Sequence, residues 1–335
     1  MKRTMLAAVG LAALLVASPT LAQGRDIKIA LIAGKTGPLE AYAKQTVTGV
    51  MLGLEYATQG TMTINGRKIV VIEKDDQIKP DVAKALLAEM YGDEKVDLAI
   101  GTTSSAAALA MLPVAEEYKK ILLVEPAVAD SITGEKWNRY IFRTSRNSTQ
   151  DALAGAVALG KGQVNVATLA QDYAFGRDGV ASLKEALAAT KGGPQVVFEE
   201  YAPQQTTDFT AHAQRLFDAL KDRQGRKIIA ITWAGPHPLS KLIDLKPERY
   251  GIELAPGGNI LPVMKGWRQF AGLEGAVYYY YAFPKNPMND WLVQEHTKRF
   301  NAPPDFFTAG GMAAAMAAVT AIRKAGSTDT EKLIA

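Results

Sequence analysis

The stretch VDLAIGTTSSAAALAML, residues 96–112, places four consecutive hydroxyl residues between an apolar run and an alanine-rich helical pattern. The apolar run ends at Gly101, and Thr102 to Ser105 then lead into the helix. This order of strand, loop and helix is the unit of a parallel α/β sheet, in which ligands bind beyond the carboxyl ends of the strands. The hydroxyl residues could therefore form a helix cap, a phosphate-binding loop, a nucleophile loop or a site for another anion.

Short apolar strands alternate with amphipathic helices on both sides of this stretch. A first series of strands is predicted at residues 27–34, 67–76, 96–101 and 121–126, with helices near 41–57, 81–91 and 105–119. A second series of strands is predicted at residues 164–172, 195–202, 227–235, 258–263 and 275–283. Continuous apolar runs between helices indicate parallel strands covered on both faces. The two series predict an α/β protein with two doubly wound lobes.

The N-terminus is typical of a secretory signal peptide. Lys2 and Arg3 precede the apolar run of residues 5–16, and small residues follow up to Ala22, where we expect cleavage. The run is too short to span a membrane. The chain has no cysteine, which excludes a lipid anchor on cysteine, a disulfide and a thiolate metal site. We therefore expect a secreted, soluble protein.

Composition and motifs argue against nucleic-acid binding and catalysis. The 38 basic residues barely exceed the 34 acidic ones, and no basic run carries interleaved aromatics, so nucleic acid is not an expected partner. GKT at residues 34–36 is similar to the end of a phosphate-binding loop, but the required earlier glycine position holds Ile29. No GxGxxG motif lies at a strand-to-helix turn, and no GxSxG motif surrounds a serine. The three histidines, His212, His237 and His296, lack zinc-site spacing. No catalytic residue, cofactor or metal site is predicted.

An ordered set of motifs resembles the periplasmic solute-binding proteins of ATP-binding-cassette (ABC) importers. The branch is that of the leucine/isoleucine/valine-binding proteins, also called type I. Besides the signal peptide, the stretches that carry this resemblance are residues 27–57, 101–133, 140–152 and 171–179, and the similarity runs over residues 25–335. Residues 277–300 and 303–319 resemble the subgroup that binds aromatic acids such as benzoates or hydroxycinnamates.

The resemblance implies a division of the chain and a mode of action. Residues 1–22 would be the signal peptide, residues 23–145 with 283–335 the first lobe, and residues 146–282 the second lobe. Crossovers are expected near residues 144–147 and 282–285, and family members usually carry a third crossover and further residues that complete the second lobe. We therefore expect the last segment of that lobe to be missing from this chain.

A monomeric periplasmic protein of this family would close its lobes over a small carboxylate and present it to an inner-membrane permease. A branched-chain amino-acid-binding protein and a ligand-sensing receptor ectodomain are the alternatives.

The resemblance also assigns a carboxylate-binding role to Ser105, with Ser104 and Thr103 beside it. The first N–H groups of a helix lack partners and lie at the positive end of its dipole, so they attract an anion. A capping bond from Thr103 or Ser104 is compatible with this role. The phosphate-binding and nucleophile roles are not supported, since the surrounding glycines and a histidine are missing.

The loop EPAVADS, residues 125–131, departs from the pattern of the amino-acid binders. Ala129 stands where those proteins carry a threonine, and Val263 or Met264 stands in place of their second-lobe glutamate. Both partners of an ammonium group are thus missing. A buried ammonium without partners costs several kcal/mol. We therefore expect a carboxylate without an amine, with Ala127 and Ala129 beside it.

Aromatic residues complete the predicted site. The positions that match pocket aromatics of the family are Tyr42, Tyr173, Phe175 and Phe307. Trp233 is a further candidate from the second-lobe loop WAGPHP, residues 233–238. His237, Lys265 and Lys35 are candidate partners for a charge or a phenol. The run Tyr278 to Tyr281 is interpreted as structural, because side chains alternate between the two faces of a strand.

Overall fold

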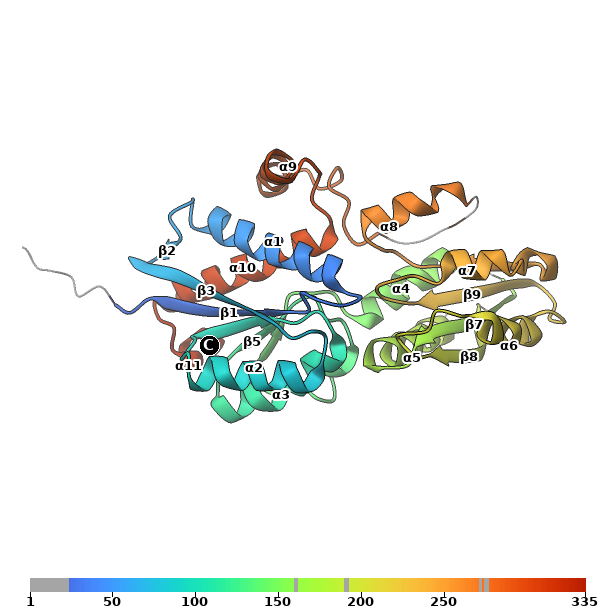
Figure 1. The fold of residues 1–335 in the computed structure, drawn as a ribbon, viewed down its shortest axis with the longest axis horizontal. Helices are drawn as coiled ribbons and strands as arrows, with labels where there is room; N and C mark the ends of the chain where they lie inside the picture. Colours follow the sequence, from blue (N-terminus) through green and yellow to red (C-terminus); the bar gives the residue numbers. More distant parts are fainter. Residues whose placement is uncertain (1–23, 160–161, 190–192, 271–272, 274–276) are drawn as a thin grey trace, which may run out of the picture.

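The computed structural model describes residues 24–159, 162–189, 193–270, 273 and 277–335. The predicted signal peptide lies outside the described residues. Two separate sheets form the framework of the protein (Figure 1).

The first sheet has the strand order β2-β3-β1-β4-β5-β6. Its strands are β1 (Ile27–Ala33), β2 (Thr63–Ile64), β3 (Arg67–Asp75), β4 (Leu98–Gly101), β5 (Leu122–Val124) and β6 (Ile141–Arg143). All neighbours pair in parallel except the edge pair β2 and β3. Helices α1 (Glu40–Ala57) and α10 (Phe306–Ala325) cover one face, and α2 (Pro80–Gly92) and α3 (Ser105–Tyr118) cover the other (Figure 1). The first sheet, the helices that cover it and the short helices η1 (Asp130–Ile132) and α11 (Thr330–Ile334) form the first half of the protein; the second sheet and its helices form the second half.

The second sheet has the order β10-β9-β7-β8, and all its strands are parallel. Its strands are β7 (Val164–Gln171), β8 (Gln195–Ala202), β9 (Arg226–Thr232) and β10 (Ile252–Ala255). Two helices pack on one face, α4 (Ser148–Leu159) and α5 (Ala174–Ala188), and two on the other, α6 (Thr210–Leu220) and α7 (Leu239–Asp244). Helices cover both faces of the sheet because successive side chains of β9 point to opposite faces. Ile228 and Ala230 contact α4 and α5, whereas Ile229 and Ile231 contact α6 and α7.

The remaining elements are η2 (Pro247–Tyr250), α8 (Leu261–Gly266), η3 (Trp267–Gln269) and α9 (Pro287–Phe300). The α/β fold with two sheets is confirmed, with one antiparallel edge pair in the otherwise parallel first sheet. Among the described helices, only α10 is long and apolar enough to cross a membrane, and half of that stretch is buried. Since α10 packs along α1, it is a core helix of the first half.

Two of the predicted strands are wrong. The segment 258–263 contains the start of helix α8 and no strand. Pro262 lies in the first turn of this helix, where backbone nitrogens have no partner within the helix, so the missing N–H of proline costs nothing there. In the predicted strand at 275–283, the described residues 277–283 form no strand. Instead, the Asn289 side chain donates hydrogen bonds to the carbonyl oxygens of Tyr281 (2.9 Å) and Pro284 (3.1 Å). The strands β2, β6 and β10 were not predicted.

Candidate functional site

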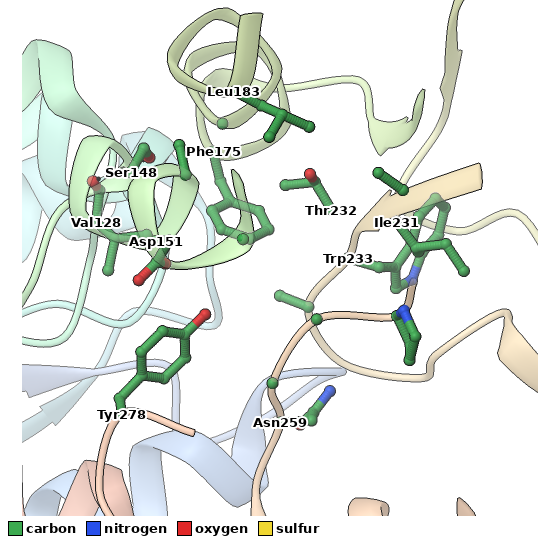
Figure 2. A pocket seen from close by; sticks show the side chains of 18 of the residues that line it. Val128, Ser148, Asp151, Phe175, Leu183, Ile231, Thr232, Trp233, Asn259 and Tyr278 are labelled. Carbon is green, nitrogen blue, oxygen red and sulfur yellow. Dashed lines mark hydrogen bonds between the residues drawn. The ribbon is translucent and has the colours of Figure 1, made fainter. Parts of the chain in front are cut away.

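A cavity of about 200 Å³ lies where the loops at the carboxyl ends of both sheets meet. Residues from α1, α4, α5 and α10 and from the loops after β4, β5 and β9 line it, and Figure 2 shows Phe175 and Trp233 on different sides of the space. Of the residues predicted for the site, those that line the cavity are Tyr42, Thr103, Ser105, Ala127, Tyr173, Phe175, Trp233 and Phe307.

The hydroxyl loop is held by its own side chains. Thr102 donates a hydrogen bond to Asp76, and Thr103 Oγ1 accepts one from the backbone N–H of Gly34 at 3.1 Å. Ser105 Oγ accepts from the backbone N–H of Ala129 at 3.2 Å. Since this bond uses Oγ only as an acceptor, the Ser105 hydroxyl proton can be donated to a ligand at the start of α3.

Ser104 occupies the N-cap position of α3, but its side chain makes no capping hydrogen bond. It is buried and is not part of the cavity wall. The loop hydroxyls therefore tie α3 to the neighbouring strands rather than cap it.

The two predicted alanines of the loop after β5 differ in their access to the cavity. Ala127 and Ala129 are both buried in the core of the first half, but only Ala127 also lines the cavity. Val263, one of the two candidates for the position of the family glutamate, packs against the apolar cluster of Leu39, Tyr42, Ile260 and Phe307. The surroundings of Val263 are thus apolar.

Tyr42 connects the two halves of the protein across the cavity. Its hydroxyl donates to Asn259 Oδ1 at 3.0 Å and accepts from the backbone N–H of Gly235 at 3.0 Å. Burial raises the pKa of Tyr42, so this phenol is neutral at physiological pH. Ser131 adds a second connection, since its N–H and hydroxyl donate to Asp178 of α5 at 2.9 and 2.8 Å. The two halves are therefore in direct contact through Tyr42 and through Ser131.

Several polar residues of the cavity wall were missed in the sequence, among them Arg146, Asp151 and Tyr278. Arg146 and Asp151 form an ion pair of 2.8 Å at the start of α4, and Tyr278, interpreted as structural, lines the cavity beside them. Burial raises the pKa of Asp151, although Arg146 favours its ionised form. The only sequence signal was a pair of opposite charges near the predicted crossover at 144–147.

The predicted charge partners lie outside the cavity wall. His237 accepts a hydrogen bond from the backbone N–H of Leu239 (3.2 Å), and burial lowers its pKa to about 4. Lys265 is exposed on α8. Lys35 forms an ion pair with Glu73 at 2.8 Å. None of these three residues lines the described cavity.

Comparisons with known proteins agree with this architecture. The family model described as "Periplasmic binding protein" matches residues 26–335. A crystal structure of an ABC-type branched-chain amino acid transporter protein from Rhodopseudomonas palustris is 72% identical, with a TM-score of 0.77, over 92% of this chain and 83% of that one. A solute-binding protein from the same species, in complex with 3,4-dihydroxybenzoic acid, is 29% identical, with a TM-score of 0.74, over 92% of this chain and 84% of that one.

Among curated proteins, the Leu/Ile/Val-binding protein homolog 3 of Brucella melitensis is 25% identical over 92% of this chain and 82% of its own length.

Proposed function

The chain belongs to the periplasmic binding protein family, and from that premise we propose that it captures a small aromatic carboxylate of the benzoate or hydroxycinnamate type. The family consists of substrate-binding components of ABC transporters, which are not enzymes, and works in the periplasm with a membrane permease. The proposed mechanism is docking on the first half through Ser105, followed by hinge closure of the second half.

One observation carries the ligand assignment: the start of helix α3, with Ser105, faces a cavity with aromatic walls. Ser105 and the first N–H groups of α3 supply donors to a carboxylate, each hydrogen bond to a charged group contributing about 1.5–3 kcal/mol. Tyr42, Phe175 and Phe307 supply ring contacts, worth about 0.5–1.5 kcal/mol each beyond their buried area. Together these contributions are of the order of the ~8 kcal/mol that micromolar binding requires.

The names of the relatives favour a branched-chain amino acid as the alternative ligand. Such a ligand needs buried partners for its ammonium group. Val263 packs in an apolar cluster, and the Asp151 carboxylate is already paired with Arg146. The complex of a 29% identical relative with 3,4-dihydroxybenzoic acid supports the aromatic acid instead.

A binding panel on the purified protein tests the proposal. Thermal unfolding should be measured with benzoate, 4-hydroxybenzoate, cinnamate, 4-coumarate and leucine. A ligand that binds only the folded state raises the melting temperature, so we expect a rise with at least one aromatic acid and none with leucine. A rise with leucine alone would show that the ligand assignment is wrong.

Ser105→Ala should weaken binding of the best acid of that panel at least about tenfold, because one hydrogen bond to the carboxylate is lost. Isothermal titration calorimetry measures the change. Ser104→Ala is the matched control, since Ser104 lies in the same loop but does not line the cavity. Equal losses in the two variants would contradict the carboxylate-binding role of Ser105.

Tyr42→Phe should lower the affinity for the same acid by about tenfold and shift the liganded protein towards an open form. The closed form would bury the N–H of Gly235 without its acceptor, which costs about 1–3 kcal/mol. Small-angle X-ray scattering with saturating ligand measures the change in shape. Unchanged affinity and an unchanged radius of gyration would show that the Tyr42 bridge does not stabilise closure.

A further inference from the structure

The ion pair of Arg146 and Asp151 lies in the wall of the cavity and is largely withdrawn from water. The relative exposures of the two side chains are 21% and 20%, and Arg146 Nε donates to Asp151 Oδ1 at 2.8 Å. The guanidinium carbon lies 3.8 Å from the centre of the Tyr278 ring and 5.3 Å from that of Phe306. Figure 2 shows the Asp151 carboxylate and the Tyr278 hydroxyl pointing into the same part of the cavity.

Local helix structure does not account for this pair. The start of α4 is already capped by a reciprocal pair, in which Asn147 Oδ1 accepts from the N–H of Gln150 and Gln150 Oε1 accepts from the N–H of Asn147 (both 2.9 Å). A buried ion pair is also weak evidence for stability, because desolvation of the two charges offsets their attraction. The pair is therefore better explained by binding than by folding.

The polar atoms of the pair suit a neutral group that both donates and accepts. Asp151 binds the guanidinium through Nε, and the Tyr278 hydroxyl lies within hydrogen-bond reach of both charged groups. The terminal amino groups of Arg146 carry further N–H donors for an acceptor. The Asp151 carboxylate offers further lone pairs to a donor. A hydroxyl satisfies both, whereas a carboxylate has no proton to donate to Asp151 and an ammonium has no lone pair to accept from Arg146.

Resting on the proposed aromatic-acid function, we propose that Arg146, Asp151 and Tyr278 form a specificity subsite for a hydroxyl group on the ligand. The subsite and the carboxylate site lie on the same wall. Ser105 Oγ accepts a hydrogen bond from the N–H of Ala129 in the loop after β5. The carbonyl oxygen of Val128, the preceding residue, accepts one from the N–H of Ser148 at 2.9 Å. Ser148 begins α4, and Asp151 follows it within the first turn. The loop after β5 therefore links the carboxylate site to the start of α4.

The matched ligands for a test are 4-hydroxybenzoate and benzoate, which differ by one hydroxyl. A site built to bond a hydroxyl discriminates against the analogue that lacks it, because its buried polar groups then stay unpaired. Calorimetry on the wild type should show a preference for 4-hydroxybenzoate of at least about tenfold. Asp151→Asn should reduce this preference to less than about threefold, since the amide accepts a phenol proton less strongly than the carboxylate does.

Tyr278→Phe is the second variant, for the case that Asp151→Asn fails to fold, and it should also reduce the preference. Asp218→Asn is the control, because it breaks an exposed ion pair with Lys221 away from the cavity and should change neither affinity. The subsite would be overturned, and the proposed function kept, if the wild type bound both acids equally. The same holds if the preference for 4-hydroxybenzoate stayed unchanged in both Asp151→Asn and Tyr278→Phe. Binding of leucine and of neither acid would overturn the proposed function together with the subsite.

Discussion

Gly49→Ala should destabilise the protein by about 2 kcal/mol, even though alanine is the better helix former. A Cβ at position 49 would overlap the backbone carbonyl oxygen of Thr308 and lie 2.8 Å from its carbon. Since the obstacle is backbone of α10 and not a flexible side chain, the two helices must separate. Overpacking typically costs about 1–3 kcal/mol, and a rigid obstacle raises the cost above the ~1 kcal/mol gained in helix propensity.

Urea unfolding of the ligand-free protein measures this loss. Gly155→Ala on α4 is the matched control, because a Cβ at position 155 would meet nothing within 4 Å and the change should stabilise the helix by up to about 1 kcal/mol. If both variants gain stability, α1 and α10 can separate without loss and their close packing is not essential.

The same close contact positions part of the cavity wall. Tyr42 lies in the first turn of α1 and Phe307 in the first turn of α10, and their ring centres are 4.7 Å apart. Gly53 and Gly311 extend the contact on the two helices, since a Cβ at either position would also overlap the facing backbone. Separation of the helices would therefore displace Tyr42 and Phe307, and Gly49→Ala should also weaken ligand binding.

The strands of both sheets that lie between long helices were predictable because their signal is local. β1, β7 and β9 contain continuous apolar or β-branched runs with both faces buried, and their helices carry clear amphipathic patterns. The segment after β10 was not predictable in this way. Its apolar residues at 258–263 and 277–283 resemble strands in composition, but a proline and the side chain of Asn289 determine their backbone structure.

The residues of the site also differ in whether local sequence signals predict them. The strand-to-helix loops place Ser105, Phe175 and Trp233 at the cavity, and the rule on carboxyl ends predicts this from strand order alone. Tyr278 meets Arg146 and Asp151 only through the tertiary fold, across more than a hundred residues of sequence. Neither propensity nor spacing carries that information, and an ion pair is recognisable as buried only once its surroundings are known.

Glu125 is a buried carboxyl group between the predicted crossover and α10. Its Oε2 accepts a hydrogen bond from Thr144 Oγ1 at 3.2 Å, and its carboxylate lies against Gly310, where any Cβ would overlap it. Burial raises the pKa of Glu125 to about 7, although Thr144 and the charge of Arg146 favour the ionised form. The folded protein therefore retains a proton at a pH at which the unfolded chain has released it.

Glu125→Gln should stabilise the protein at pH 8 and leave its stability nearly unchanged at pH 5. The pKa of Glu125 is higher in the folded state, so wild-type stability falls as the pH rises from the ordinary value of 4.5 to about 7 and stays reduced above it. The expected gain at pH 8 is up to about 3 kcal/mol, measured by urea unfolding of both proteins at the two pH values. Glu117→Gln, at an exposed position of α3, is the control and should show no such difference. A gain of the same size at pH 5 would show that the effect comes from packing and not from the charge of Glu125.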